Sequence, residues 1–462
     1  MRFRGNAVLD PYVRNEDSLV FIQPKSIGET CILEFHDHAK IDAQRTAAGT
    51  KLGNLFIGGV DSSSATRGGR IILRLYSDAH HNSSYAPAGS ATSGAVGYIV
   101  TVGDGMGYAE IDMTNGTFAA GINGLRIGCK YNFTKGSAST GVVHVAGGLL
   151  RSDGLGCMYP GWLTPGTLGG DMVGTSTGYA DGWFYGRVTI DGGAYENRRG
   201  HLFVGYGTAE GEWFQNGGTA TICSQKTATY TPSYKSVTAP VQYATNNVFV
   251  LGCANGKGSF TQTGGDVVDN LRTYVGGVAT NEITIYQTYA ECFGTLLTDY
   301  STRGYGDRHN ATGYLGVLGG NFTATHSIMV GQDGTGVLEV GPTGTLHAAS
   351  IVLTNNAYTA AGDHAATLKF TFGEDGVGTA TVTNLVIGAG AALTVDMTGY
   401  EYAKSKPSRF PLLRAANVEG AFDEANVSLL IDDAKLATKA FLDRRPDGID
   451  IKIANGSAII FR

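Results

Sequence analysis

The sequence predicts an all-β protein: a right-handed parallel β-helix closed by a small C-terminal β cap. Three observations predict this fold class. A strand phrase recurs along the chain, the glycines that end this phrase are spaced almost regularly, and the composition holds 69 glycines among 462 residues. Such self-similarity indicates that one small strand-turn unit is stacked many times.

The recurring phrase is an aliphatic segment that ends in glycine, followed after a polar gap by an alternating segment that ends in Gly-Gly or a close variant. The clearest copies are LRIG with GVVHVAGG (125–148), VFVLG with GSFTQTGG (248–265), IMVG with GVLEVGPTG (328–344), and LFVG before EWFQNGG (202–218). Short alternating segments that stop at glycine are typical of β-strands joined by tight corners.

The glycines that close the aliphatic segments are separated by gaps near one or two multiples of about 22 residues, which suits one turn of a parallel β-helix. They are Gly58, Gly103, Gly128, Gly174, Gly205, Gly252, Gly331 and Gly373. A turn of about 22 residues predicts roughly 15 turns between residues 53 and 394, and a rod roughly 70 Å long at about 4.8 Å per strand.

The composition supports a folded β protein. Hydrophobic residues make up 42% of the chain, which is too high for a disordered segment, and the glycines lack the three-residue period of collagen. Charged residues reach only 16%, and β-branched and aromatic residues are dense. Long helices are therefore not expected.

The repeats divide the chain into three parts. Residues 1–52 are denser in charge and poorly repetitive, and we interpret them as an N-terminal cap or partial first turns. Residues 53–399 carry the β-helix repeats without a polar linker, and residues 400–462 form the predicted C-terminal β cap. Caps at both ends are expected because the open ends of a stacked sheet are aggregation edges.

The predicted cap contains its own strand pattern. Ile449, Ile451 and Ile453 alternate with polar residues and belong to one buried face. A turn at Asn455-Gly456 would join this strand to 458–461 as a hairpin. A short helix is predicted near 432–442.

Charge and hydropathy exclude some partners. The net charge of −6 gives no electrostatic reason to expect nucleic acid or an anionic membrane. No apolar run approaches the roughly 18 residues that a membrane-spanning helix requires, and the opening residues lack the hydrophobic core of a signal peptide. We expect no nucleic-acid partner and no membrane insertion. The pairs Arg198-Arg199 and Arg444-Arg445 are isolated, so we interpret them as solvated corners.

Six cysteines lie at positions 31, 129, 157, 223, 253 and 292, without the Cys or His spacing of a zinc site. The sequence therefore predicts no metal and no cofactor. Cys129 and Cys253 each follow a phrase glycine directly, which favours small buried thiols. The alternative is bridges between adjacent turns, because Cys157 follows Cys129, and Cys253 follows Cys223, at spacings close to one turn.

The segment DYSTRGYGDRH (299–309) holds the strongest candidates for catalysis. Arg303, Asp307, Arg308 and His309 supply a base and charge partners within one predicted loop. Proton abstraction next to a carboxylate requires such groups. Parallel β-helix polysaccharide lyases, which this chain resembles in predicted architecture, commonly use an Arg or Lys base. His144, in contrast, lies inside VVHV and is expected to be a ladder residue.

Aromatic residues in the middle third suggest a binding function instead. Trp162, Trp183, Tyr185, Trp213 and Phe214 lie in predicted loop-bearing turns. Exposed rings on a long face can stack on sugar rings, so Trp183, Tyr185 and Trp213 are the predicted glycan-binding residues. The alternative is that these rings pack over or inside the rod.

The repeat phrases GVVHVAGGLL, GRVTIDGGAY, GYLGVLGGNF and GVLEVGPTGTLHAASIVLTNN resemble those of bacterial autotransporter passenger domains and related pectin-lyase-like surface proteins. The ending LTVDMTGYE through DGIDIKI is similar to the segment that closes many such repeats. The resemblance covers residues 53–462. It implies secretion or display on a bacterial cell surface, although no membrane-barrel domain accompanies the repeats.

Two functions therefore stand as hypotheses. The first is a non-catalytic structural or adhesion module that binds an extracellular polysaccharide or a host or cell-surface glycan, and that self-associates through the ends or faces of the solenoid. The second is a polysaccharide lyase or glycoside hydrolase that works in a groove along the β-helix, with the 299–309 loop contributing.

Overall fold

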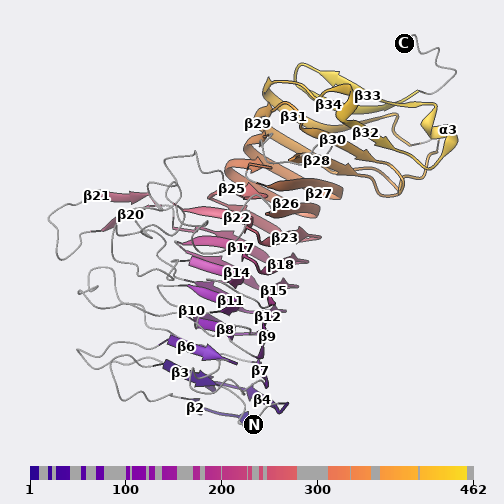
Figure 1. Ribbon diagram of the computed structural model, residues 1–462. Coiled ribbons are helices and arrows are strands. Elements are labelled where there is room, and N and C mark those ends of the chain that lie inside the picture. The colour runs from indigo at the N-terminus through magenta and orange to yellow at the C-terminus, as the bar shows by residue number, and fades with distance from the viewer. Residues whose placement is uncertain are drawn as a thin grey trace.

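Parallel strands stacked in three columns form most of the described chain in a computed structural model (Figure 1). Among the residues that the structure describes, the main sheet contains 30 strands. The predicted all-β parallel β-helix is therefore confirmed. The structure describes residues 1–9, 19–22, 28–41, 54–58, 69–76, 100–104, 107–120, 124–130, 138–152, 170–176, 183–198, 200–225, 227–230, 239–242, 247–277, 311–332, 334–354, 365–403 and 406–454.

Each complete turn contributes one strand to each column. The first column contains β1 (Arg2–Phe3), β4 (Thr30–Phe35), β7 (Arg70–Leu75), β9 (Tyr108–Met113), β12 (Ser139–Val145), β15 (Phe184–Ile190), β18 (Glu210–Gln215), β23 (Lys257–Gln262), the starts of β26 (Thr312–Val330) and β27 (Thr335–Leu353), β28 (Ala366–Thr371), β30 (Ala392–Asp396) and β32 (Val427–Leu430).

The second and third columns follow in chain order. The second contains β10 (Thr117–Ala120), β13 (Leu149–Ser152), β16 (Ala194–Asn197), β19 (Thr219–Ile222), β24 (Asp266–Asp269), the middles of β26 and β27, and parts of β29 (Thr379–Ile387) and β31 (Arg409–Glu419). The third contains β3 (Leu19–Ile22), β6 (Asn54–Ile57), β8 (Val100–Asp104), β11 (Leu125–Lys130), β14 (Gly170–Ser176), β17 (His201–Gly207), β22 (Val248–Ala254), β25 (Arg272–Val275) and the ends of β26, β27, β29 and β31.

Two small sheets lie outside the columns. β2 (Val8–Leu9) pairs with β5 (Lys40–Ile41) in parallel, and β20 (Thr227–Tyr230) pairs with β21 (Ala239–Gln242) as an antiparallel ribbon. In Figure 1, β20 and β21 lie to the left of the rod, and β2 lies at its N-terminal end.

The turns are longer and less uniform than the predicted period of about 22 residues. β6 pairs directly with β8, with Leu55 beside Val100, so a gap that the sequence counted as two turns is one. The turn from Lys257 to Thr312 holds more than twice as many residues as the next turn, from Thr312 to Thr335. Between residues 53 and 394 the first column has ten described levels, fewer than the roughly 15 predicted.

The glycines that end the third-column strands are required by the corner into the first column. Seven of the eight predicted markers have φ between 63° and 76°, and Gly373 does not share this conformation. Gly276, with a φ of 85°, is a further member that the spacing missed. A Cβ on Gly128 would lie 1.8 Å from the Tyr185 carbonyl oxygen, so the backbones of two columns meet with no room for a side chain.

One hydrophobic core runs the length of the rod. In the first column, inward side chains stack directly on one another, with Val188 paired to Trp213 and Trp213 to Phe260. The rings of Trp213 and Phe260 lie 5.8 Å apart and nearly parallel, and Tyr195 meets Trp213 edge-on at 4.6 Å. Stacked aromatic rings stabilise this part of the core beyond the burial of their area.

The C-terminal cap is an antiparallel layer on top of the last parallel turn. Parallel pairing extends past residue 400, because β31 pairs with β29 and β32 with β30. β34 (Gly448–Ile453) then pairs antiparallel with both β31 and β33 (Ala440–Arg445). The short helices η3 (Glu424–Asn426) and α3 (Ala434–Ala437) complete the cap.

The cap agrees with the sequence in its buried face and differs in its turn. Ile449, Ile451 and Ile453 are buried as predicted. The hairpin of β34 is made with the preceding strand β33, while the predicted hairpin at Asn455-Gly456 lies outside the described residues. The helix predicted over 432–442 is limited to the single turn α3, where the Asp433 side chain accepts from the amides of Lys435 and Leu436.

Two of the cysteines considered for bridges are buried thiols. Cys253 lies in β22 beside Tyr206, whereas Cys223 follows β19, so the two belong to different columns. Cys31 is a thiol in β4. Cys157, Cys292 and the Cys129 side chain lie outside the described part of the chain.

Candidate functional site

Several residues proposed from the sequence lie where the structure gives no description. Arg303, Asp307, Arg308 and His309 all belong to the segment between β25 and β26 that lies outside the described residues, and so does Trp162. The catalytic alternative therefore stays a sequence-based hypothesis.

Trp213 is placed inside the rod. Its side chain is 1% exposed and packs between Tyr195 and Phe260, because Trp213 is an inward position of β18. A ring in this position cannot present a face to a sugar. The structure removes Trp213 from the predicted glycan-binding residues and assigns it to the core, which is the alternative interpretation of these aromatics.

Trp183 and Tyr185 form a stacked pair of aromatic rings on the outer face of the first column. Trp183 precedes β15 and is 54% exposed. Its ring lies 5.3 Å from the Tyr185 ring, with 4° between the two planes. Tyr185 supports one face of the indole, since parallel rings at this spacing stack favourably. The large exposed fraction leaves much of Trp183 in contact with solvent.

Charged groups from β15 itself and from the next strand, β18, lie beside the two rings. The Tyr185 hydroxyl donates to a Glu212 carboxylate oxygen in β18, and the Arg187 guanidinium lies 4.5 Å from the centre of the Phe214 ring. Burial, and then the Glu212 carboxylate, raise the pKa of Tyr185. We call Trp183, Tyr185, Arg187, Glu212 and Phe214 the platform. It offers an aromatic face beside hydrogen-bond donors and acceptors.

The tyrosine-carboxylate pair recurs on the same face of the first column. The Tyr108 hydroxyl donates to Glu110 at 2.7 Å, with Arg70 stacked 4.3 Å from the Tyr108 ring centre. The Tyr314 hydroxyl donates to Glu339 at 2.9 Å. Burial is the main cause that raises the pKa of Tyr108 to about 12, and burial also raises the pKa of Tyr314. All three phenols therefore remain protonated donors at neutral pH.

An ion-pair ladder continues this face toward the N-terminus. Glu34 contacts Arg2 at 2.6 Å and Arg74 at 3.3 Å, and the Arg2 guanidinium is the main cause that lowers the Glu34 pKa. Between the levels of Tyr108 and Tyr185, His144 in β12 lies between Asp112 at 3.1 Å and Asp191 at 2.7 Å. His144 pairs in register with Asp112 in β9, which confirms its prediction as a ladder residue.

Buried polar groups at the corner between the second and third columns are structural. Asp171 accepts from the Leu125 amide at 2.8 Å and from the Tyr195 hydroxyl at 2.5 Å. One turn further, the Nδ1 atom of His201 accepts from the Val248 amide at 3.0 Å. Each side chain thus accepts from the first amide of a third-column strand, as buried donors require.

The pKa values of these groups follow from burial. Desolvation raises the pKa of Asp171, lowers that of His201 to about 3, and raises that of Asp269 to about 7. All three side chains are almost fully buried, so substrate does not reach them from solvent. We therefore assign their shifted pKa values to fold maintenance and not to catalysis.

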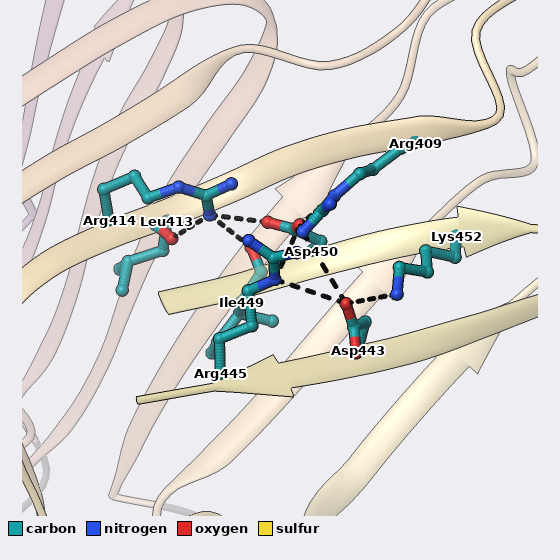
Figure 2. Close-up of polar contacts among 8 residues, drawn as sticks. All are labelled: Arg409, Leu413, Arg414, Asp443, Arg445, Ile449, Asp450 and Lys452. Atoms are coloured by element: carbon teal, nitrogen blue, oxygen red, sulfur yellow. Dashed lines mark hydrogen bonds and ion pairs between the residues drawn. The ribbon is translucent and has the colours of Figure 1, made fainter. Parts of the chain in front are cut away.

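A group of cations on the outer face of the C-terminal cap surrounds a buried carboxylate (Figure 2). We call Arg409, Arg414, Arg445 and Lys452 the basic cluster. Asp450 is fully buried beneath it; Arg409 pairs with its Oδ2 atom, and Arg414 contacts its Oδ1 atom at 2.5 Å.

The second carboxylate of the group joins the outer strands of the cap. Asp443 in β33 accepts from Lys452 at 2.8 Å and lies 3.4 Å from Arg445 Nε. Arg445 Nε also lies 3.5 Å from Asp450. The sequence did not reveal this group, because its members come from three strands. Arg445 ends β33 next to a turn and is partly exposed, as the sequence suggested, but it is not isolated, because it pairs with Asp443 and Asp450.

The described residues contain no group of three or more His, Cys, Asp or Glu side chains arranged to hold a metal ion. Within the same residues, no helix is both long and apolar enough to span a membrane.

Comparison of the chain with models of protein families, with curated proteins and with solved structures finds no match. The parallel β-helix thus rests on the strand pairing itself.

Proposed function

We propose that this protein is a non-catalytic extracellular or cell-surface β-solenoid that acts as a structural or adhesion module and binds glycans. The observation that carries the proposal is the exposed Trp183 ring, supported on one side by Tyr185 and bordered by Glu212 and Arg187. Carbohydrate sites commonly combine a flat apolar face with charged hydrogen-bonding groups, which is what this platform offers.

The long outer face supports the same proposal. Tyrosine-carboxylate pairs occur at Tyr108, Tyr185 and Tyr314, on strands separated by two and three levels of the first column. Neighbouring levels lie about 4.8 Å apart, so these pairs span roughly 25 Å. An extended polymer could contact several of them at once. The passenger-like kinship and the surface location are part of this proposal and rest on the repeat phrases.

Binding of neutral and acidic oligosaccharides to the intact chain tests the platform. Trp183→Ala is expected to weaken binding about tenfold, since loss of one stacking face removes roughly 1–1.5 kcal/mol. Trp183→Phe should retain most of the affinity. Phe441→Ala, which removes another exposed ring, is the control and should leave binding unchanged. Equal binding by Trp183→Ala and the unaltered chain would refute the platform.

Catalysis by the 299–309 segment is the alternative, and a product assay separates it from binding. Incubation with acidic and neutral polysaccharides should yield neither new reducing ends nor unsaturated products. Product formation that Arg303→Ala abolishes would replace the binding function with a lyase or hydrolase.

A further inference from the structure

We propose that the basic cluster on the C-terminal cap binds the sulfate or carboxylate groups of a polyanionic glycan. The glycan class rests on the proposed function, whereas the demand for anions comes from the cluster itself. This surface is separate from the platform, because β33 and β34 lie at the C-terminal end of the rod and β15 lies near its middle (Figure 1).

The charge balance of the cluster leaves positive charge to be satisfied. Arg409, Arg414, Arg445 and Lys452 surround only two carboxylates, Asp443 and Asp450, so the group carries a net charge of two positive. The chain as a whole is negative by six. A local excess of cations on an acidic protein is an electrostatic focus for anions.

The cations remain accessible although they cover Asp450. Their side chains are between 34% and 38% exposed, whereas that of Asp450 is 0% exposed. The cations thus hold the carboxylate, on which the arginines converge in Figure 2, and still keep about a third of each side chain exposed to solvent. A ligand anion would meet partly desolvated charges, which attract it more strongly than fully hydrated ones.

Unused donors give the cluster a binding geometry. The hydrogen bond and ion pairs of Arg445 with Asp443 and Asp450 are made by Nε, and its side chain is 35% exposed, so its terminal nitrogens can serve a ligand. Arg414 uses Nη1 for Asp450 and for the Leu413 carbonyl, and its Nη2 takes no described partner. Guanidinium forks match the paired oxygens of sulfate and carboxylate groups.

The buried Asp450 prepares the cluster for binding. By contacting three guanidinium groups from two strands, β31 and β33, Asp450 holds long side chains that would otherwise lose rotamer freedom on binding. Preorganised donors bind with a smaller entropic cost. The net charge of two calls for at least two anionic groups close together, which a polyanionic chain supplies and a single neutral sugar does not.

Calorimetric titration of the intact chain tests the inference with three probes: a sulfated hexasaccharide of heparin type, a hexauronate and a neutral glucan hexasaccharide. The double variant Arg445→Gln/Lys452→Gln removes Lys452, which pairs with Asp443, and Arg445, whose contact with Asp450 at 3.5 Å is longer than those of Arg409 and Arg414. The double variant should bind the acidic probes about tenfold or more less tightly than the unaltered chain, because charge-assisted hydrogen bonds are lost. The unaltered chain should also bind that probe less tightly as salt rises.

Arg444→Gln is the matched control. Arg444 is the neighbour of Arg445, but it donates to the Phe422 carbonyl at 3.1 Å instead of contacting the carboxylates of the cluster. Arg444→Gln removes one positive charge from β33, the strand that also carries Arg445, and should leave affinity within about twofold. Thermal unfolding of each variant establishes that the cap is folded before binding is compared.

The outcomes separate the two proposals. Binding of the sulfated probe alone assigns sulfate groups, binding of the uronate alone assigns carboxylates, and both results support the cluster. If neither acidic probe binds at low salt, the proposed anion site is refuted. It is also refuted if the double variant binds the acidic probes as tightly as the unaltered chain does. If the double variant loses binding of the acidic probes and Trp183→Ala changes the binding of no oligosaccharide, the platform is refuted and the cluster is supported. If Trp183→Ala weakens binding and the double variant does not, the cluster is refuted and the platform is supported.

Discussion

Gly128 and Gly5 share a φ of 63° but lie in different surroundings. A Cβ at Gly128 would lie 1.8 Å from the Tyr185 carbonyl oxygen, while a Cβ at Gly5 would meet nothing within 4 Å. Gly128→Ala therefore adds a backbone clash to the cost of left-handed φ, and Gly5→Ala adds only that cost. We expect a loss of about 1–2 kcal/mol for Gly5→Ala and at least twice that for Gly128→Ala.

Chemical unfolding of the two alanine variants, followed by circular dichroism, measures this difference. Equal losses in unfolding free energy would show that the corner can relax around a methyl group.

Asp269 should make stability depend on pH. Its pKa is raised to about 7 by burial, above the value near 3.9 of an unfolded aspartate, so the folded chain retains a proton that the unfolded chain has released. The stabilising contribution is complete below about pH 4 and is lost as pH rises through 7. Asp269→Asn, which can still accept from the Leu271 amide, should unfold at a higher temperature than the unaltered chain at pH 8.

The size of this effect is at most roughly 4 kcal/mol, the free energy that corresponds to a pKa of about 7 in the folded chain against about 3.9 in the unfolded chain. Melting temperatures of both proteins between pH 4.5 and pH 8 provide the test, and the difference between them should grow with pH. His201 acts in the opposite direction: its pKa, lowered to about 3, removes stability as pH falls below about 6.5 in both proteins. A constant difference across the range would contradict the assignment to Asp269.

At the level of single residues, the sequence predicted the core more successfully than the surface. Ile449, Ile451 and Ile453 were predicted to be buried because they alternate with polar residues along one strand, and all three are buried. Trp213 and Trp183 could not be told apart, because whether a residue in a strand faces in or out depends on register with the neighbouring turn. Register is a property of paired strands and cannot be deduced from either strand alone.

Among the strand elements, the cap sheet depends on the Asp450 carboxylate. Three arginines from β31 and β33 contact it, and replacement by asparagine leaves them without this counter-charge. Their exposure to solvent limits the cost, so we expect Asp450→Asn to destabilise the protein by about 2–3 kcal/mol, less than for a fully buried pair. Hydrogen exchange should show the loss concentrated in β33 and β34.

Arg444→Gln again provides the comparison, because it changes β33 without touching Asp450. Unchanged exchange in β33 and β34 of Asp450→Asn would mean that the isoleucine face alone holds the cap. The elements of this sheet were only partly predictable. The alternation of β34 was visible in the sequence, but its partner strands β31 and β33 were fixed by tertiary pairing that the local pattern does not encode.

For the whole molecule, the cap covers the last open edge of the columns. β31 pairs with β29, β32 pairs with β30, and buried residues such as Phe410 and Leu413 seal the core beneath. A chain ending at residue 408 would expose the backbone groups of β29 and β30. Exposed strand edges pair with other chains, so we expect this truncated protein to self-associate.

Size-exclusion chromatography with light scattering at matched concentrations compares the truncated and intact chains, after circular dichroism has established retained β structure. An unchanged number of chains per particle would show that the cap is not required to block the edge.

The architecture of the whole molecule was predictable because the same sequence phrase occurs in many turns, and the glycine that ends the phrase lies at the same corner in seven of the eight copies. The turn length was not, because sequence spacing cannot distinguish one long circuit from two short ones. Leu55 beside Val100 decides that question only through strand pairing.

Circuits of very different length occupy neighbouring levels of one stack, as the circuits on either side of Thr312 show. The β-helical frame therefore tolerates large differences in the number of residues per turn. Such a frame is a ready carrier for foreign peptides: antigenic epitopes or binding loops grafted between two columns would be displayed at fixed intervals along a stiff support, each adjustable without redesign of the others.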